Sequence, residues 1–253
     1  DELGFVTGVE FSARPISGSL HILGLGIDEE HPALRSTAEF LRDARTSRNR
    51  RIVEKLQSLG MAIEMSDVLE IACGKRGTGS QPVSDDVSDT ACEAVPRDAL
   101  VVGRPHIAEA MRRRARVADV SEAFKKYLAR GSAAYVERDR PTPADTIAAI
   151  REAGGFAVAA HPVHWKCENS ARTERVLRRL ISLGLDGVEV YHSDHTPQFT
   201  RQYLDLARRF NLKITGGSDF HGHAKPEVKL GRPRVPVSAV GREFVDELVA
   251  RSR

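Results

Sequence analysis

The second half of the chain alternates short apolar runs with helix-like segments, and this alternation limits the available folds more than any other feature. Helices are predicted at 142–153, 172–183 and 196–210, and each precedes an apolar run typical of a buried strand. These runs are 156–160, 187–191 and 212–215. Strands joined through helices in this way form right-handed crossovers and pair in parallel. The sequence therefore predicts an α/β fold, closed as a barrel or as part of one.

Each of these runs leads to an imidazole or a carboxylate. His161 follows the first run, His195 lies just beyond the second, and Asp219 and His221 follow the third in a glycine-rich turn. In α/β proteins the chemistry collects at the carboxyl ends of the strands. Carboxylate and imidazole ligands together suit zinc, iron or manganese. The pattern therefore predicts a site for divalent metal.

The N-terminal segment adds two residues of the same kind. Strands are predicted at 5–11 and 20–27, and a hairpin between them places Glu10 roughly opposite His21, close enough to share a metal. Two or more metals can activate water and hold a phosphoryl group, as in metal phosphoesterases. The predicted metal ligands are Glu10, His21, His161, Asp219 and His221.

Composition restricts the classes of protein open to this chain. Of its 253 residues, 41% are hydrophobic and 29% charged, as in ordinary globular proteins. No apolar run approaches the roughly 20 residues of a membrane helix, and the first residues do not resemble a signal peptide. The three cysteines are widely spaced, which favours reduced thiols in a cytosol. We therefore expect a cytoplasmic protein with no membrane partner and no obligate protein partner.

Charge is less informative than composition. The net charge of +3 is weak evidence for an anionic partner. Arginine clusters at 42–51 and 112–116 have helical spacing, which is typical of solvated helix faces, with a nucleic-acid patch as the alternative.

The middle of the chain differs in character from both ends. Residues 32–134 carry mostly helical patterns, interrupted at 73–95 by a stretch rich in Gly, Ser and Asp that predicts a flexible loop. The predicted organisation is a barrel built from 1–31 and 135–253, with 32–134 as a mostly helical insertion.

Six motifs occur in an order that indicates a known family. They are Val9-Glu10-Phe11-Ser12, His21-Ile22-Leu23-Gly24, Gly103-Arg104-Pro105-His106-Ile107-Ala108, Ala160-His161-Pro162, Gly187-Val188-Glu189-Val190-Tyr191 and Gly217-Ser218-Asp219-Phe220-His221-Gly222. With these motifs the chain resembles the PHP (polymerase and histidinol phosphatase) superfamily. It looks closest to the stand-alone metal-dependent phosphoesterases that act on nucleoside phosphates and on short RNA or DNA ends.

The resemblance implies a distorted (β/α)7 barrel with up to three divalent metal ions (Mn, Zn or Fe) in its mouth. Glu10 would bridge two of them, and His21 and His161 would complete one site. Asp219 would join Glu10 at a second site, and His221 would bind the third metal.

One family motif does not occur before Glu10. The family opens with a His-x-His pair, so the resemblance implies an N-terminally incomplete barrel that lacks two βα units, roughly 60 residues. Only the site of Glu10, His21 and His161 would then retain all of its family ligands.

Further residues have both a functional and a structural interpretation. Arg104 and His106 begin a predicted helix, where free N–H groups favour anions; the resemblance implies that they bind the substrate phosphate, and a plain surface helix start is the alternative. His195 could contact phosphate or protonate the leaving group, or could be a loop residue. Glu189 could orient a metal ligand or pair with an arginine. His164 is assigned no role.

The resemblance implies hydrolysis of phosphate esters of nucleotides or short oligonucleotides by metal-activated water, with processing from the 5′ end as one form. Two alternatives stay open. One is a histidinol-phosphate-type small-molecule phosphatase, and the other is a truncated or inactive metal-binding domain.

Overall fold

The computed structural model describes residues 4–73, 101–222 and 225–252. The chain forms two compact units, the first comprising 1–41 with 140–253 and the second 42–139. The insertion predicted at 32–134 stays a prediction, because compactness alone does not define an inserted domain. The flexible loop predicted at 73–95 lies outside the described residues except for Cys73.

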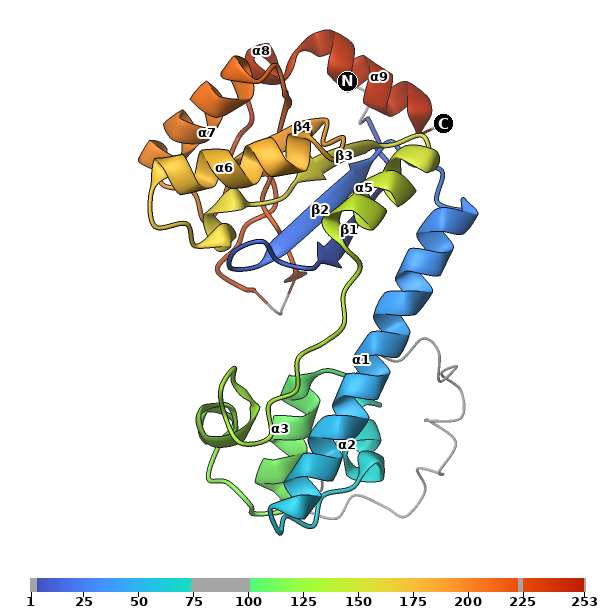
Figure 1. The fold of residues 1–253 in the computed structure, drawn as a ribbon, viewed down its shortest axis with the longest axis vertical. Helices are drawn as coiled ribbons and strands as arrows, with labels where there is room; N and C mark the ends of the chain where they lie inside the picture. Colours follow the sequence, from blue (N-terminus) through green and yellow to red (C-terminus); the bar gives the residue numbers. More distant parts are fainter. Residues whose placement is uncertain (1–3, 74–100, 223–224, 253) are drawn as a thin grey trace. The chain divides into compact units, whose positions relative to one another are not determined.

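The first unit contains a five-stranded mixed sheet, shown with its helices in Figure 1. The strands are β1 (Gly8–Ala13), β2 (Leu20–Leu25), β3 (Phe156–Ala159), β4 (Gly187–His192) and β5 (Lys213–Gly217), paired in that order. β2 is antiparallel to both β1 and β3, whereas β3, β4 and β5 are parallel. The predicted α/β class is therefore confirmed. Among the described residues the strand order is linear and does not show a seven-stranded barrel.

Three helices, each preceding one of the parallel strands, build the core on one face of the sheet. They are α5 (Pro143–Glu152), α6 (Ser170–Ile181) and α7 (Pro197–Arg209). Each begins at a side chain that accepts a hydrogen bond from the first turn, namely Thr142, Asn169 and Thr196. Their apolar stripes pack on alternate residues of the strands, including Ile22, Ala159 and Val188. These helices match the three predicted from the sequence.

The opposite face of the sheet carries the polar side chains. Phe11 and Ile22 lie in the core, so their neighbours Glu10 and His21 point to the other face. In the β1–β2 register, Glu10 is paired with Leu23, and His21 with Ser12. Glu10 and His21 are thus diagonal neighbours, two residues apart in register, which agrees with the hairpin prediction that placed them roughly opposite each other.

The second unit is helical. It contains the C-terminal part of α1 (Pro32–Ser58), α2 (Met65–Ala72), α3 (Arg104–Arg113), α4 (Val120–Ala123) and η3 (Phe124–Leu128). A separate apolar cluster holds it together, including Ile52, Leu56, Ile107, Met111 and Leu128.

The chain ends with α8 (Val237–Val240) and α9 (Arg242–Arg251), both in the first unit. Phe244 of α9 packs edge-on against Phe156 of β3, with ring centroids 5.0 Å apart. Of the helices in the described ranges, none is both long and apolar enough to cross a membrane.

Cys167 is free, whereas Cys73 is disulfide-bonded, so the prediction of reduced thiols was wrong at Cys73.

Candidate metal centre

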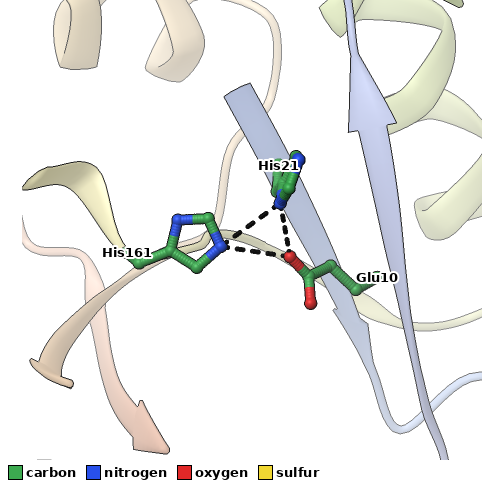
Figure 2. A group of neighbouring side chains, drawn as sticks. All are labelled: Glu10, His21 and His161. Carbon is green, nitrogen blue, oxygen red and sulfur yellow. Dashed lines mark hydrogen bonds and ion pairs between the residues drawn. The ribbon is translucent and has the colours of Figure 1, made fainter. Parts of the chain in front are cut away.

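Three of the five predicted metal ligands meet at one point on the polar face of the sheet. Glu10 Oε1 lies 2.7 Å from His21 Nδ1 and 3.1 Å from His161 Nε2, and the two ring nitrogens are 3.3 Å apart. Figure 2 shows the carboxylate and both rings pointing toward one another. Among the described residues, these are the only three ligand-type side chains with ligand atoms all within 4.8 Å of one another.

Each of the three side chains comes from a different part of the sheet or its edge. Glu10 lies in β1 and His21 near the start of β2, while His161 lies two residues after the end of β3. The backbone N–H of Ala160 donates to the carbonyl of His21 at 3.1 Å, which joins the end of β3 to β2 beside the site. Strand pairing thus brings the three side chains together from distant parts of the sequence.

His161 adopts a backbone conformation that residues with a Cβ rarely take. Its φ is 26° and its ψ 66°, at the start of the 3-10 turn η4 (Pro162–Trp165). Such a conformation is costly and persists only where the surroundings enforce it. Here the buried carboxylate of Glu189 accepts the His161 backbone N–H at 2.7 Å. Glu189 therefore orients His161, which is one of the two roles that the sequence left open.

The charges of these groups depend on one another. Hydrogen bonds from His161 and His21 hold the pKa of Glu10 far below its usual range. Burial alone would lower the pKa of His161, but the Glu10 carboxylate outweighs it and the pKa is raised. Burial raises the pKa of Glu189 to about 7, against the opposing effect of the His161 N–H. The negative charge of the Glu10 carboxylate is thus stabilised by the two imidazoles that bond to it.

The donor set fits a divalent transition metal. One carboxylate oxygen and two imidazole nitrogens are ligands that zinc, manganese and iron accept. His161 Nδ1 is buried and has no hydrogen-bond partner among the described residues, whereas metal-binding histidines usually donate this N–H to a partner. The types and positions of the three ligand atoms fit a divalent metal. The unpartnered His161 Nδ1 departs from the usual pattern of metal-binding histidines.

Asp219 and His221 do not join this group. Asp219 Oδ2 is ion-paired with the ammonium group of Lys225, and His221 Nδ1 lies 3.3 Å from Asp219 Oδ1. Asp219 also has a left-handed backbone, with φ 53°. Its charge adds to the effects that raise the pKa of Glu189, so it contributes to the electrostatics of this face. Their roles as ligands of further metals therefore stay predictions.

A row of histidines continues from His161 along the carboxyl ends of β3 and β4. The ring centroid of His192 lies 5.3 Å from those of His161 and His195. His195 Nδ1 donates to the carbonyl of Val190 at 2.9 Å, and its Nε2 is buried without a described partner. His195 thus lies at the predicted edge of the sheet, next to His192. Its catalytic role stays a prediction.

One hydrogen-bonded pair at this edge, His164 with Asp194, was not predicted from the sequence. His164 Nε2 lies 2.9 Å from Asp194 Oδ2, and the His164 ring centroid is 4.5 Å from that of His161. Burial, followed by the charge of His161, lowers the pKa of His164. The position of His164 three residues after His161 was the only available signal, and it did not indicate the turn that brings it to Asp194.

Arg104 and His106 belong to the second unit, at the start of α3. Arg104 Nη1 donates to the carbonyl of Leu128 at 2.9 Å, and its guanidinium lies over the rings of Phe124 and Tyr135. His106 Nδ1 accepts the Gly103 N–H at 3.1 Å. Both side chains are thus engaged within their own unit, and phosphate binding by them stays a prediction.

The fold and the site of Glu10, His21 and His161 define an α/β protein with a candidate metal centre beside the end of β3, the start of β2 and the middle of β1. The chain is 30% identical over 231 residues to a 5′-3′ exoribonuclease, Rnm, of Salmonella typhimurium, covering 91% of this chain and 69% of the relative. It is 29% identical over 219 residues to a 3′,5′-nucleoside bisphosphate phosphatase of Chromobacterium violaceum, covering 86% and 67%.

A solved structure agrees with these relatives. A protein from Bifidobacterium adolescentis, assigned as a metal-dependent phosphoesterase, superposes with a TM-score of 0.69 at 30% identity, over 98% of this chain and 77% of that one. No family model matches the chain. The chain belongs to the PHP-type family of phosphoesterases, which confirms the resemblance inferred from the six motifs.

Changing Glu189 tests its part in holding His161. We expect Glu189→Ala to weaken metal binding about 10–100-fold, as is usual when the partner of a metal ligand is lost. Glu189→Gln keeps an acceptor oxygen for the His161 N–H and should stay within about threefold of the unchanged protein. Chelator competition measures both affinities, with circular dichroism as the control for folding. Unchanged affinity in Glu189→Ala would show that Glu189 does not orient the ligand.

His192 should make the protein sensitive to mild acid. Burial lowers the pKa of His192 to about 4 from its ordinary 6.5. The folded state therefore resists protonation, so its stability is complete above pH 6.5 and falls as the pH drops toward 4. His192→Asn keeps an acceptor for the Asp194 N–H without titrating. We expect urea unfolding to show that this variant loses less stability between pH 7 and pH 4, by up to about 3 kcal/mol. Parallel acid profiles would contradict the assignment.

Proposed function

We propose that this chain is a metal-dependent phosphoesterase that hydrolyses phosphate esters of nucleotides or short oligonucleotides. The observation that carries the proposal is the convergence of Glu10, His21 and His161 within 2.7–3.3 Å of one another. Relatives that cover most of this chain are named as an exoribonuclease and a nucleoside bisphosphate phosphatase, and both act on phosphate esters of nucleotides. Processing from the 5′ end is the form suggested by the first of these.

The three residues would hold a divalent cation, with manganese, zinc and iron as the candidates. When bound, such an ion makes water a nucleophile at neutral pH and neutralises charge on a phosphoryl group. Glu10 supplies the anionic oxygen, and its low pKa keeps it ionised throughout the physiological range. His21 and His161 supply neutral donors from β2 and from the end of β3. Asp219 and His221 are the candidates for further metals, once Asp219 exchanges its ion pair with Lys225 for a cation.

Other residues would bind or protonate the substrate. Arg104 and His106 would bind the phosphate that is not being cleaved, and Arg104 would do so through donors other than the Nη1 that Leu128 engages. His195 would contact the phosphate or protonate the leaving group. Because its Nδ1 donates to Val190, its Nε2 can donate only after taking up a proton, and burial opposes this by lowering the pKa of His195. We also propose that the five-stranded sheet forms part of the distorted (β/α)7 barrel that the family resemblance implies. A cytoplasmic location and the lack of an obligate protein partner stay predictions.

Removing the charge of Glu10 tests the proposal most simply. We expect Glu10→Gln to weaken metal binding and to lower kcat/KM at least about 100-fold, because the single anionic ligand is lost. The substrate panel comprises a 5′-phosphorylated RNA oligomer, a nucleoside 3′,5′-bisphosphate and histidinol phosphate, each assayed with manganese and with chelator. Glu30→Gln, on an exposed acidic residue, is the matched control. No phosphate or nucleotide release from any of the three substrates by the metal-loaded protein would refute the proposal.

A further inference from the structure

A polar hollow lies in the first unit, at the β1–β2 loop and the start of α6. Its volume is about 290 Å³, and it is lined by Ser17, Lys166, Glu168, Asn169, Arg172 and Arg175. We call it the basic hollow. These residues come from the β1–β2 loop, from the segment after η4 and from the first turns of α6. It lies outside the group formed by Glu10, His21 and His161.

The charges of the basic hollow are not balanced. Three cationic side chains face one carboxylate, that of Glu168. Within the described ranges, none of these cationic side chains forms an ion pair, whereas Arg178, further along α6, pairs with Glu174 at 2.8 Å. Gathering unpaired cations into one hollow costs electrostatic free energy that an anionic ligand recovers. Arginine donors in particular suit the oxygens of a phosphate group.

The hollow and the metal centre are connected through two short segments of the chain. Lys166 follows His161 by five residues, so their Cα atoms are at most about 18 Å apart. The β1–β2 loop, which connects the strands of Glu10 and His21, is tied to η4 by the Ser19 N–H bond to the His164 carbonyl at 3.0 Å. Gly18 fits there because a Cβ atom would overlap the backbone of His164 and Trp165. The separation suits a short nucleotide chain that reaches from one place to the other.

We propose that the basic hollow binds a phosphate of a single-stranded oligonucleotide, one or more positions from the phosphate that is hydrolysed. This inference rests on the proposed function and specifies its substrate as a chain of nucleotides. Among the residues that the structure describes, the lining includes no aromatic side chain on which a base could stack. Binding here is therefore to the sugar–phosphate backbone, sensitive to salt and independent of base sequence.

The direct test measures binding without catalysis. The probe is a fluorescein-labelled, phosphorothioate RNA ten-mer, titrated by anisotropy in chelator at several salt concentrations. The variant is Arg172→Gln with Arg175→Gln. The matched control is Arg179→Gln with Arg208→Gln, which removes the same charge from exposed positions on α6 and α7. We expect the variant to bind at least tenfold more weakly at low salt, with a salt slope smaller by about 1.4 for two lost contacts. Equal affinity and slope in variant and control would overturn the inference.

A second measurement identifies the source of the phosphate. The second phosphate of a nucleoside 3′,5′-bisphosphate has the same chemistry as an internal phosphate of RNA. We expect the variant to raise KM for the 5′-phosphorylated ten-mer about tenfold, with kcat unchanged, and to leave KM for the bisphosphate unchanged. A rise in KM for the bisphosphate alone would overturn the assignment to an oligonucleotide.

The two proposals can fail separately. If the protein releases no product from any substrate but the variant still loses RNA affinity in chelator, the basic hollow stands and the phosphoesterase proposal falls. If metal-dependent hydrolysis is normal and neither affinity nor KM changes in the variant, the basic hollow alone is refuted.

Discussion

The site depends on strand pairing that brings two imidazoles to one carboxylate oxygen. The β1–β2 register makes Glu10 and His21 diagonal neighbours on the face away from α5, α6 and α7. Pairing of β2 with β3 then brings His161 to the same oxygen, although 151 positions separate it from Glu10. The strand pairing therefore brings ligand atoms from three distant parts of the chain to one point.

Glu189 links the fold to this arrangement. It lies inside β4, on the polar face, and its carboxylate is buried against the backbone of His161. A buried carboxylate with a pKa raised to about 7 is unfavourable unless it has a specific partner. The His161 N–H stabilises the buried carboxylate of Glu189, and the same hydrogen bond holds the strained backbone turn at His161. Sequence alone identified both residues, but only the structure shows that the contact runs through a backbone N–H.

Elements set by local interactions could be predicted from the sequence, whereas contacts between residues far apart in the chain could not. Periodic apolar residues and capping threonines, such as Thr142 and Thr196, are local, so α5, α7 and the strands between them were predictable. The hairpin could be placed only roughly from the sequence, and its exact register, with Glu10 opposite Leu23, comes from the structure. The pairing of Asp219 with Lys225, and the burial of Arg104 against aromatic rings, depend on packing that no local pattern encodes.

The central claim is that Glu10, His21 and His161 share one cation. The most direct measurement is an anomalous difference map from crystals of the protein grown with manganese or zinc. The account predicts a peak about 2.0–2.2 Å from Glu10 Oε1, His21 Nδ1 and His161 Nε2 together. A bound ion elsewhere in the molecule, with these three side chains bonded only to one another, would contradict it.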